Sequence, residues 1–403
     1  MKKLLSLNNY HYKRGGSDAV FIEHDKVFQE LGWETAKFAM HHENNNASQW
    51  AEYFVDEIEF GNSYSRLEKI KMAAKVIYSL EAKNKINLLI DHFKPDIVHS
   101  HCIYHHLSPS VLVAVKKHDI PSVMTAHDLK LACPAYKMLN ENGVCESCKS
   151  GNFRSLLKNK CIHGSLLASA LVYVESSVHK MLGLYKNNLD AIIAPSLFYK
   201  EKLVEWGWDE SQIVYIPNYI DVADYEPDYN VGSYFLYFGR LALEKGIPTL
   251  MAAAESLGVK VVVVGTGPLE SELIKNAPDN VSFVGYQTGN KLHNLIRGAK
   301  AVVLPSEWYE NAPISLLEAY ACGKPVIGAN IGGIPELIIE SHTGFLFESG
   351  VSESLTNVLS YVDNLPDSTI NTIGKAAREY VSTKYTKKNY IDNTLALYKQ
   401  FGV

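Results

Sequence analysis

The sequence lacks any apolar run of the roughly 18 residues that a membrane-spanning helix needs. It also lacks an excess of positive charge, since 39 lysines and arginines stand against 44 acidic residues and leave a net charge of -5. This balance argues against a general nucleic-acid-binding protein. Heptad repeats and low-complexity segments are absent as well. We therefore expect a globular protein whose 403 residues are too many for one ordinary core.

Three familiar phosphate- and metal-binding motifs are missing too. The sequence contains no P-loop lysine motif, no dinucleotide fingerprint with its glycine spacing, and no Asp-X-Asp motif placed to hold a metal. The first residues, MKKLLSLNNYHY, become polar too quickly for a signal peptide and are typical of a first strand. We therefore expect a cytoplasmic protein whose six cysteines are kept reduced.

Short apolar runs, typical of buried parallel strands, recur along the chain with helical patterns between most of them. This alternation predicts parallel sheets with helices on both faces. A polar segment at 221–232, with Pro227 and no periodicity, is typical of an interdomain linker. The strands expected before this linker are 4–7, 36–39, 97–100, 122–126, 191–195 and 213–216. Those expected after it are 234–238, 260–265, 281–284, 301–305, 325–328 and 344–347.

The predicted fold class is α/β, with two doubly wound, Rossmann-like domains facing each other across a cleft. We expect residues 1–220 to form the first domain and residues 221–385 the second. Open parallel sheets bind ligands beyond the carboxyl ends of their strands, and clefts between domains favour small molecules. The sequence therefore predicts a small-molecule site between two sheet edges.

The stretch 301–335 holds the strongest candidate site. Its pattern predicts a strand, a loop, a helix that starts at Pro313 and ends before Gly323, and a second strand with a two-glycine turn. Two carboxylates, Glu310 and Glu318, flank the helix start. Either could simply complement the helix dipole. Their place at the carboxyl end of a strand also suits a ligand-binding role.

Two cations, Arg240 and Lys245, follow the strand expected at 234–238. Solvated surface charge would explain either one alone. A phosphate at the helix start would be repelled by Glu310 and Glu318, and the two cations together offset that repulsion. Backbone amides after Glu310 add hydrogen bonds, which leaves the carboxylates free to accept bonds from hydroxyl groups. This balance fits a diphosphate between two hydroxylated rings, which is a nucleotide sugar.

Weaker candidates lie at other strand ends. Gly15 and Gly16 follow the first strand and let the backbone approach an anion, although glycine pairs often form only turns. His127 follows another strand and is either a structural histidine or a partner of a sugar hydroxyl. Gly285 and Tyr286 either contact a base or form a turn. Four further histidines show no metal-binding spacing and are expected partly on the acceptor side and partly on the surface: His99, His101, His105 and His106.

Four cysteines gather in one loop-rich segment: Cys133, Cys145, Cys148 and Cys161. Four reduced thiols at these spacings fit a structural tetrathiolate zinc site. Two disulfides or a transient redox pair are the alternatives. A zinc ion with four cysteine ligands would have no open position for chemistry, so we expect a structural role.

The segment 149–174 carries cations and no acid, and it overlaps the apolar helical run LLASALVYV. A core-facing helix with a solvated basic approach would explain this pattern. A surface element that meets anionic lipid headgroups would explain it as well. The cations are Lys149, Arg154, Lys158 and Lys160.

These residues together resemble the retaining family-4 glycosyltransferases of GT-B fold, over nearly the whole chain. The most specific part is the E-x7-E block from Glu310 to Glu318, with CGKPVIG and GGIPELI behind it and Arg240 and Lys245 before it. The glycine loop, His127, IAPS at 193–196 and IPN at 216–218 match in order. The cysteine segment after HDLKLACP resembles a bacterial-type branch of polysaccharide and glycan-assembly transferases. In one departure, a tyrosine at 219 stands where the family usually has glycine.

The resemblance implies roles for these positions. Glu310 would contact the hydroxyls of the donor sugar and Glu318 the ribose, while Arg240 and Lys245 would hold the diphosphate and stabilise it as it leaves. A last helix, at about 386–403, would cross back onto the first domain. The remaining donor contacts would be His127 to the sugar, and Gly16 with the backbone amides of Asn311, Ala312 and Ile314 to the diphosphate.

The activity expected from the resemblance is transfer of a hexose, with retention of anomeric configuration, to a glycan or lipid-linked acceptor. A UDP-sugar is the family's commonest donor, with GDP-mannose left open. No metal cofactor is expected in catalysis, and the protein is expected at the inner face of the cell membrane or free in the cytoplasm. The alternatives are a nucleotide-sugar epimerase of the same architecture and a non-catalytic nucleotide-sugar-binding protein.

Overall fold

The computed structural model describes residues 1–57 and 65–403. The first half of the chain forms a six-stranded parallel sheet with the order β2-β1-β3-β4-β7-β8. Its register places Leu5 beside Ala36 and Val98, so apolar side chains meet across neighbouring strands. The strands are β1 (Lys3–Leu7), β2 (Glu34–Phe38), β3 (Ile97–Ser100), β4 (Ser122–Thr125), β7 (Ala191–Ala194) and β8 (Ile213–Tyr215).

The second half forms another six-stranded parallel sheet, with the order β11-β10-β9-β12-β13-β14. Its strands are almost wholly apolar because both faces are covered by helices. They are β9 (Phe235–Phe238), β10 (Val261–Val264), β11 (Val281–Phe283), β12 (Ala301–Leu304), β13 (Val326–Ala329) and β14 (Gly344–Phe347). All twelve strands expected from the sequence are present, and the predicted α/β class of two doubly wound sheets is confirmed.

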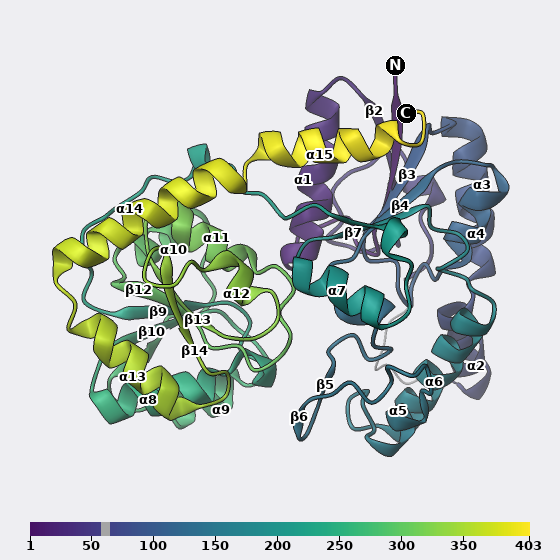
Figure 1. Ribbon diagram of the computed structural model, residues 1–403. Coiled ribbons are helices and arrows are strands. Elements are labelled where there is room, and N and C mark those ends of the chain that lie inside the picture. The colour runs from purple at the N-terminus through teal and green to yellow at the C-terminus, as the bar shows by residue number, and fades with distance from the viewer. Residues whose placement is uncertain (58–64) are drawn as a thin grey trace.

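Helices surround both sheets, and the two halves lie side by side (Figure 1). Those of the first half are α1 (Gly16–Glu30), α2 (Arg66–Ile77), α3 (Leu80–Phe93), α4 (Ser110–Lys117), α5 (Arg154–Lys158), α6 (Leu166–Met181) and α7 (Leu197–Glu205). Those of the second half are α8 (Ile247–Leu257), α9 (Glu270–Lys275), α10 (Gly289–Arg297), α11 (Ile314–Ala321), α12 (Ile334–Leu337), α13 (Ser352–Asp363) and α14 (Asp367–Lys384). The 3-10 turns are Ala51–Tyr53, Leu129–Leu131, Glu210–Gln212, Val222–Asp224 and Leu243–Lys245. No helix in the described ranges is long and apolar enough to cross a bilayer.

The last helix, α15 (Lys387–Lys399), returns from the second half to the first, as the yellow ribbon in Figure 1 shows. Its buried residues Tyr390, Leu397 and Tyr398 share a core with Leu4 and Phe28 of the first sheet and its helices. The chain therefore crosses between the halves twice, after β8 and after α14.

Two local details differ from the sequence-based expectation. Pro313 is the residue before α11 rather than its first helical position, because its ψ of 115° is extended and the helix begins at Ile314. The cysteine segment also contains a small antiparallel hairpin that the sequence pattern did not predict, formed by β5 (Leu139–Asn140) and β6 (Gly143–Val144).

Candidate active site

The strand order of each sheet reverses at one place, and the candidate residues lie there. In the second sheet the reversal falls between β9 and β12, and Arg240 follows β9 while Glu310 follows β12. In the first sheet it falls between β1 and β3, and Gly15 follows β1. Such reversals open a crevice at the carboxyl ends of the strands, where α/β proteins bind ligands.

Close backbone packing holds the Glu310 loop. The N–H of Gly333 donates to the carbonyl oxygen of Glu310 at 2.7 Å. A Cβ added to Gly333 would lie 1.9 Å from the carbonyl oxygen of Asn311, and one added to Gly332, whose φ is +61°, would lie 2.4 Å from that of Glu310. Only glycine allows this approach, so the two-glycine turn predicted after β13 braces the loop after β12.

Glu310 is buried and ion-paired. The Lys245 ammonium lies 2.5 Å from its Oε1, and the Ser306 hydroxyl donates to the same oxygen at 2.7 Å. Burial opposes ionisation of the carboxyl, but the charge and hydrogen bond of Lys245 outweigh it and hold the pKa of Glu310 below its usual value. The site therefore carries an ionised carboxylate and a cation already in contact.

Arg240 and the backbone supply further groups for an anion. Arg240 is exposed and forms no salt bridge with the described residues. Among the hydrogen bonds of the described chain, the N–H groups of Asn311, Ala312 and Ile314 have no acceptor. These amides lie at the start of α11, where the helix dipole is positive. The Lys245–Glu310 pair and three open N–H donors thus lie in the loop that leads into α11, and Arg240 follows the neighbouring strand β9.

Glu318 lies on the second turn of α11 and differs from Glu310. The hydroxyl of Tyr225 donates to its Oε1 at 3.3 Å. Burial raises the pKa of Glu318, opposed by Tyr225 and by the charge of Lys13. Lys13 belongs to the glycine loop of the first half, so Glu318 lies within electrostatic reach of that loop.

The glycine loop itself approaches the start of α11. A Cβ on Gly16 would lie 3.6 Å from the Cδ1 atom of Ile314, while one on Gly15 would have no neighbour within 4 Å. Gly15 caps α1 in an extended conformation. The glycine loop and the start of α11, which were predicted to contact a diphosphate from opposite sides, therefore lie close together.

Asn311 ties the two halves of the chain. Its Nδ2 donates to the carbonyl oxygens of Ala126 at 2.8 Å and of His127 at 3.2 Å, and its Oδ1 accepts from the Ser196 hydroxyl at 2.7 Å. Next to it, Asn218 donates to the carbonyl oxygen of Ala312 at 3.1 Å. These bonds place His127 beside the loop that carries Glu310.

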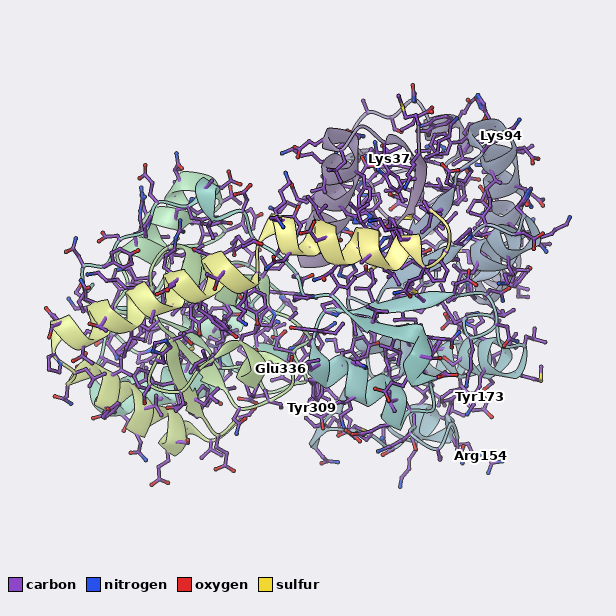
Figure 2. All side chains as sticks on the ribbon, turned by 45° about the horizontal axis from the view of Figure 1, so that its top comes forward. Lys37, Lys94, Arg154, Tyr173, Tyr309 and Glu336 are labelled. Atoms are coloured by element: carbon purple, nitrogen blue, oxygen red, sulfur yellow. The ribbon has the colours of Figure 1, made fainter. Side chains whose placement is uncertain are left out.

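A second contact between the halves lies beside the first. The Glu336 carboxylate accepts from the backbone N–H of Leu197 at 2.8 Å and from that of Phe198, so a residue of the second half caps α7 of the first. The hydroxyl of Tyr309 donates to Glu146 at 2.9 Å. Figure 2 shows Tyr309 and Glu336 at the boundary between the halves.

His127 is only partly exposed, and its Nε2 lies 2.8 Å from Nδ1 of His101. Burial lowers its pKa to about 4, so the imidazole is neutral at ordinary pH. It can therefore act as a hydrogen-bond partner without carrying a charge.

Two family models match the chain in succession, Glycosyltransferase Family 4 over residues 47–224 and Glycosyl transferases group 1 over residues 229–380. This protein belongs to the family-4 glycosyltransferases. An uncharacterized glycosyltransferase of Methanocaldococcus jannaschii is 24% identical over 307 residues, 71% of this chain and 85% of that protein. Other curated relatives align over 29% to 61% of their own length.

Superposition on solved structures shows that this glycosyltransferase has the GT-B fold. Sucrose-phosphate synthase from Thermosynechococcus elongatus superposes with a TM-score of 0.74 at 18% identity and covers 99% of both chains. The Anabaena protein HepE, solved in complex with UDP-glucose, superposes with a TM-score of 0.68 at 17% identity over 98% of this chain and 99% of its own. The architecture that the sequence resemblance implied is confirmed.

The family motifs IAPS and IPN have a structural explanation in this glycosyltransferase. Ser196 and Asn218 end them, and both side chains contact the loop Asn311–Ala312 of the other half. Tyr219, which replaces the usual glycine, does not adopt a positive φ, and its ring packs against that of Tyr390 at 4.8 Å. The turn therefore does not require glycine in this chain.

Gly285 and Tyr286 lie where the sequence placed them, at the end of β11. The carbonyl oxygen of Gly285 accepts from the N–H of Gly265 at 2.9 Å, and Tyr286 is 69% exposed. The turn therefore lies beside the end of β10. The contact of Gly285 and Tyr286 with the base of a nucleotide stays a prediction.

The four cysteines are free thiols within one insertion. Burial and then the neighbouring thiols of Cys133, Cys161 and Cys145 raise the pKa of Cys148 to about 12. In the described chain, no three cysteine sulfurs lie within 4.8 Å of one another, whereas nitrogens of His24, His99 and His101 do. The structure gathers the thiols without bringing them to ligand spacing. The sequence could not reveal the histidine group, because His24 comes from α1.

The sequence pattern did not indicate several residues that lie at the site. Lys13 and Tyr225 approach Glu318, and the side chain of Asn311 bridges the halves rather than serving only through its amide. Lys13 stands two residues before Gly15 in the glycine loop, which was a usable signal. Tyr225 lies in the polar linker, where nothing in the sequence separates it from its neighbours.

Proposed function

We propose that this glycosyltransferase moves a hexose from a UDP-sugar to a glycan or lipid-linked acceptor and retains the anomeric configuration. One observation carries the proposal: the Lys245–Glu310 ion pair lies where three N–H groups of the chain have no acceptor. That combination offers positive charge to a diphosphate and a carboxylate to hydroxyl groups. The likeness to a fold neighbour solved with UDP-glucose supports the choice of donor.

Donor binding would rearrange the ion pair. A diphosphate at the start of α11 competes with Glu310 for Lys245, and Arg240 adds the second positive charge. Glu310 then accepts hydrogen bonds from sugar hydroxyls, which carry no charge and do not repel it. On the second turn of α11, beside Tyr225, Glu318 accepts hydrogen bonds from the hydroxyls of the ribose.

The same groups would serve the chemical step. The bond between the anomeric carbon and a diphosphate oxygen breaks, and negative charge grows on that oxygen. Lys245, Arg240 and the amides are fixed beforehand where the charge develops, which is the arrangement that lowers a barrier most. The acceptor hydroxyl attacks from the face that the diphosphate leaves, its oxygen bonds to the anomeric carbon, and its proton passes to the departing phosphate.

Two measurements test the proposal. Calorimetry with UDP and with GDP measures donor-base preference, and release of UDP from UDP-hexoses, with and without acceptor extracts, measures turnover. Arg240→Ala and Glu310→Ala should each lose at least about a hundredfold in transfer, the typical cost of one group that stabilises developing charge. The exposed Lys291→Ala and Glu353→Gln of the same half are the matched controls. Unchanged transfer in both active-site variants would reject the assignment, and product formation without acceptor would favour an epimerase.

We further propose that the α5–α6 surface contacts an anionic membrane, where a lipid-linked acceptor would be found. Leu167 is 85% and Met181 77% exposed at opposite ends of α6. Arg154, Lys158 and Lys160 are exposed nearby, while Lys149 pairs with Glu205 at 2.9 Å. The inner face of α6 is buried, so this helix has both a core side and an exposed apolar side. Figure 2 shows Arg154 and Tyr173 at one end of the molecule.

Vesicle sedimentation tests the membrane contact. Each basic residue near an anionic surface contributes about 1 kcal/mol. Replacing Arg154, Lys158 and Lys160 together by Gln should therefore weaken binding to phosphatidylglycerol vesicles by about two orders of magnitude. Phosphatidylcholine vesicles should show little binding of either protein. Equal sedimentation of the variant and the parent would reject the surface.

We also propose that the cysteine insertion binds a structural zinc ion. Burial and then the neighbouring thiols raise the pKa of Cys148 to about 12, and a bound divalent cation would stabilise the thiolate form of each ligand. Binding would draw the four sulfurs together. Metal analysis of the purified protein should find about one zinc per chain. If all four thiols can be titrated and the purified protein contains no zinc, the proposed zinc site is rejected.

A further inference from the structure

A row of buried imidazoles leads from the active site into the first half. His127 and His101 are stacked, with ring centroids 5.1 Å apart and planes 14° apart, and His101 and His99 are stacked at 4.8 Å and 12°. His99 lies within β3 and His101 directly follows that strand, while His127 lies just beyond the neighbouring strand β4. Parallel strands therefore place the three rings side by side.

The far end of the row is saturated with hydrogen bonds. His99 contacts the hydroxyl of Tyr398 through Nδ1 at 2.6 Å and that of Thr125 through Nε2 at 2.7 Å. His24 contacts the hydroxyls of Tyr390 at 2.8 Å and Tyr398 at 3.2 Å. Both ring nitrogens of His24 and of His99 are thus occupied, so a metal ion shared with His101 would have to break these bonds. The two tyrosines come from α15, which closes this core.

His101 is the exception in the row. Its Nδ1 lies 2.8 Å from Nε2 of His127, while its own Nε2 is buried with no partner in the described chain. One proton lies between the two rings, on either His101 or His127. If His127 held it, the proton of neutral His101 would sit on Nε2 as a buried N–H without acceptor. Buried donors without partners are rarer in proteins than buried acceptors without partners.

We propose that His101 is a positioning residue that donates its Nδ1–H to Nε2 of His127 and thereby fixes His127 as the Nδ1–H tautomer. Nδ1 of His127 is the ring nitrogen that has no partner in the described chain, and the residue is partly exposed. His127 therefore presents a neutral hydrogen-bond donor to the cleft. It can donate to a sugar hydroxyl oxygen but cannot accept from a hydroxyl through this ring nitrogen.

The charge state of the row is consistent with this assignment. Burial, followed by the other imidazoles, lowers the pKa of His101 well below its usual value. Burial also lowers the pKa of His127 to about 4. Since a neutral imidazole carries one N–H, each ring has a single proton to place, and the choice for one ring decides the choice for the next.

The ligand contact rests on the proposed function, whereas the tautomer does not. Long-range nitrogen–proton correlation spectra of uniformly labelled protein, with His127 assigned through His127→Gln, report which ring nitrogen carries hydrogen. We expect a protonated Nδ1 and an unprotonated Nε2 in His127. A proton on Nε2 would overturn the inference whatever the activity of the His101 variants. The expected tautomer in a protein that transfers no sugar would reject the proposed function alone.

Two substitutions at His101 separate positioning from packing. His101→Asn can place an amide N–H near the former Nδ1, so it should keep the tautomer and transfer within a few-fold. His101→Phe keeps the ring but has no donor, and kcat should fall about tenfold, the equivalent of one net hydrogen bond. KM for the donor should change less than kcat. His342→Phe is the exposed control. Equal transfer by the Asn and Phe variants, whether lost or kept, would overturn the inference.

Discussion

Replacement of Lys245 by Met is the sharpest test of the ion pair at the candidate active site. Met keeps the unbranched stem and removes the charge that lies 2.5 Å from Glu310. The side chains of Lys245 and Glu310 are 22% and 10% exposed, so solvent screens the pair weakly. Without its partner the buried carboxylate either stays charged, at a cost of about 3–5 kcal/mol, or takes up a proton.

Proton uptake by Glu310 sets the size of the expected loss of folding stability. In the parent, the pKa of Glu310 lies below its usual value of 4.5, so its stabilising contribution is present above pH 4.5 and is lost as the pH falls through the folded pKa. In Lys245→Met the folded pKa is raised, so the penalty is absent below the usual value and grows as the pH rises. If the raised pKa reaches 7 or more, the penalty at pH 7 is about 3 kcal/mol, or 1.36 kcal/mol for each of about 2.5 pH units.

Chemical unfolding of parent and variant at about pH 4.5 and about pH 7 measures this difference. The variant should be less stable than the parent at both pH values, and the difference should be clearly larger at the higher pH. Lys245→Met combined with Glu310→Gln has no group left to titrate there, so it should remove most of the pH dependence. A penalty that is the same at both pH values would show that Lys245 acts through packing, and would refute the electrostatic reasoning.

Three further predictions follow from the same contacts. Glu310→Gln removes a negative charge beside the diphosphate site, so by calorimetry it should bind UDP several-fold more tightly while losing transfer. Asn311→Ala removes three hydrogen bonds between the halves, worth about 1 kcal/mol each, and should lower kcat/KM by about tenfold to a hundredfold with an expanded shape in solution scattering. Gly333→Ala puts a Cβ 1.9 Å from the carbonyl oxygen of Asn311, so it should lower the thermal midpoint and abolish transfer, whereas unchanged values would show that the loop can shift.

Local patterns were enough to predict the strands and their fold class. A buried parallel strand is a short apolar run, such as VVVV at 261–264, and its hydrophobic residues identify it without reference to the rest of the chain. Glu310, Arg240 and Lys245 could be assigned to one site because each follows a strand, and parallel strands bring their carboxyl ends to one edge of the sheet. That Lys245 pairs directly with Glu310 in the donor-free protein was not predicted, because spacing along the chain does not report side-chain contact.

Local residue patterns are enough to predict which elements form and which edge of each sheet carries the charged residues, because hydrophobic runs and turn residues act locally. How the two edges meet depends on contacts between distant segments. Asn311 reaches Ala126 and Ser196, which are more than a hundred positions away, and the tautomer of His127 depends on a buried nitrogen of His101. Such contacts depend on how strands from distant segments are ordered and on how the two sheets face each other. No local pattern of residues encodes either arrangement.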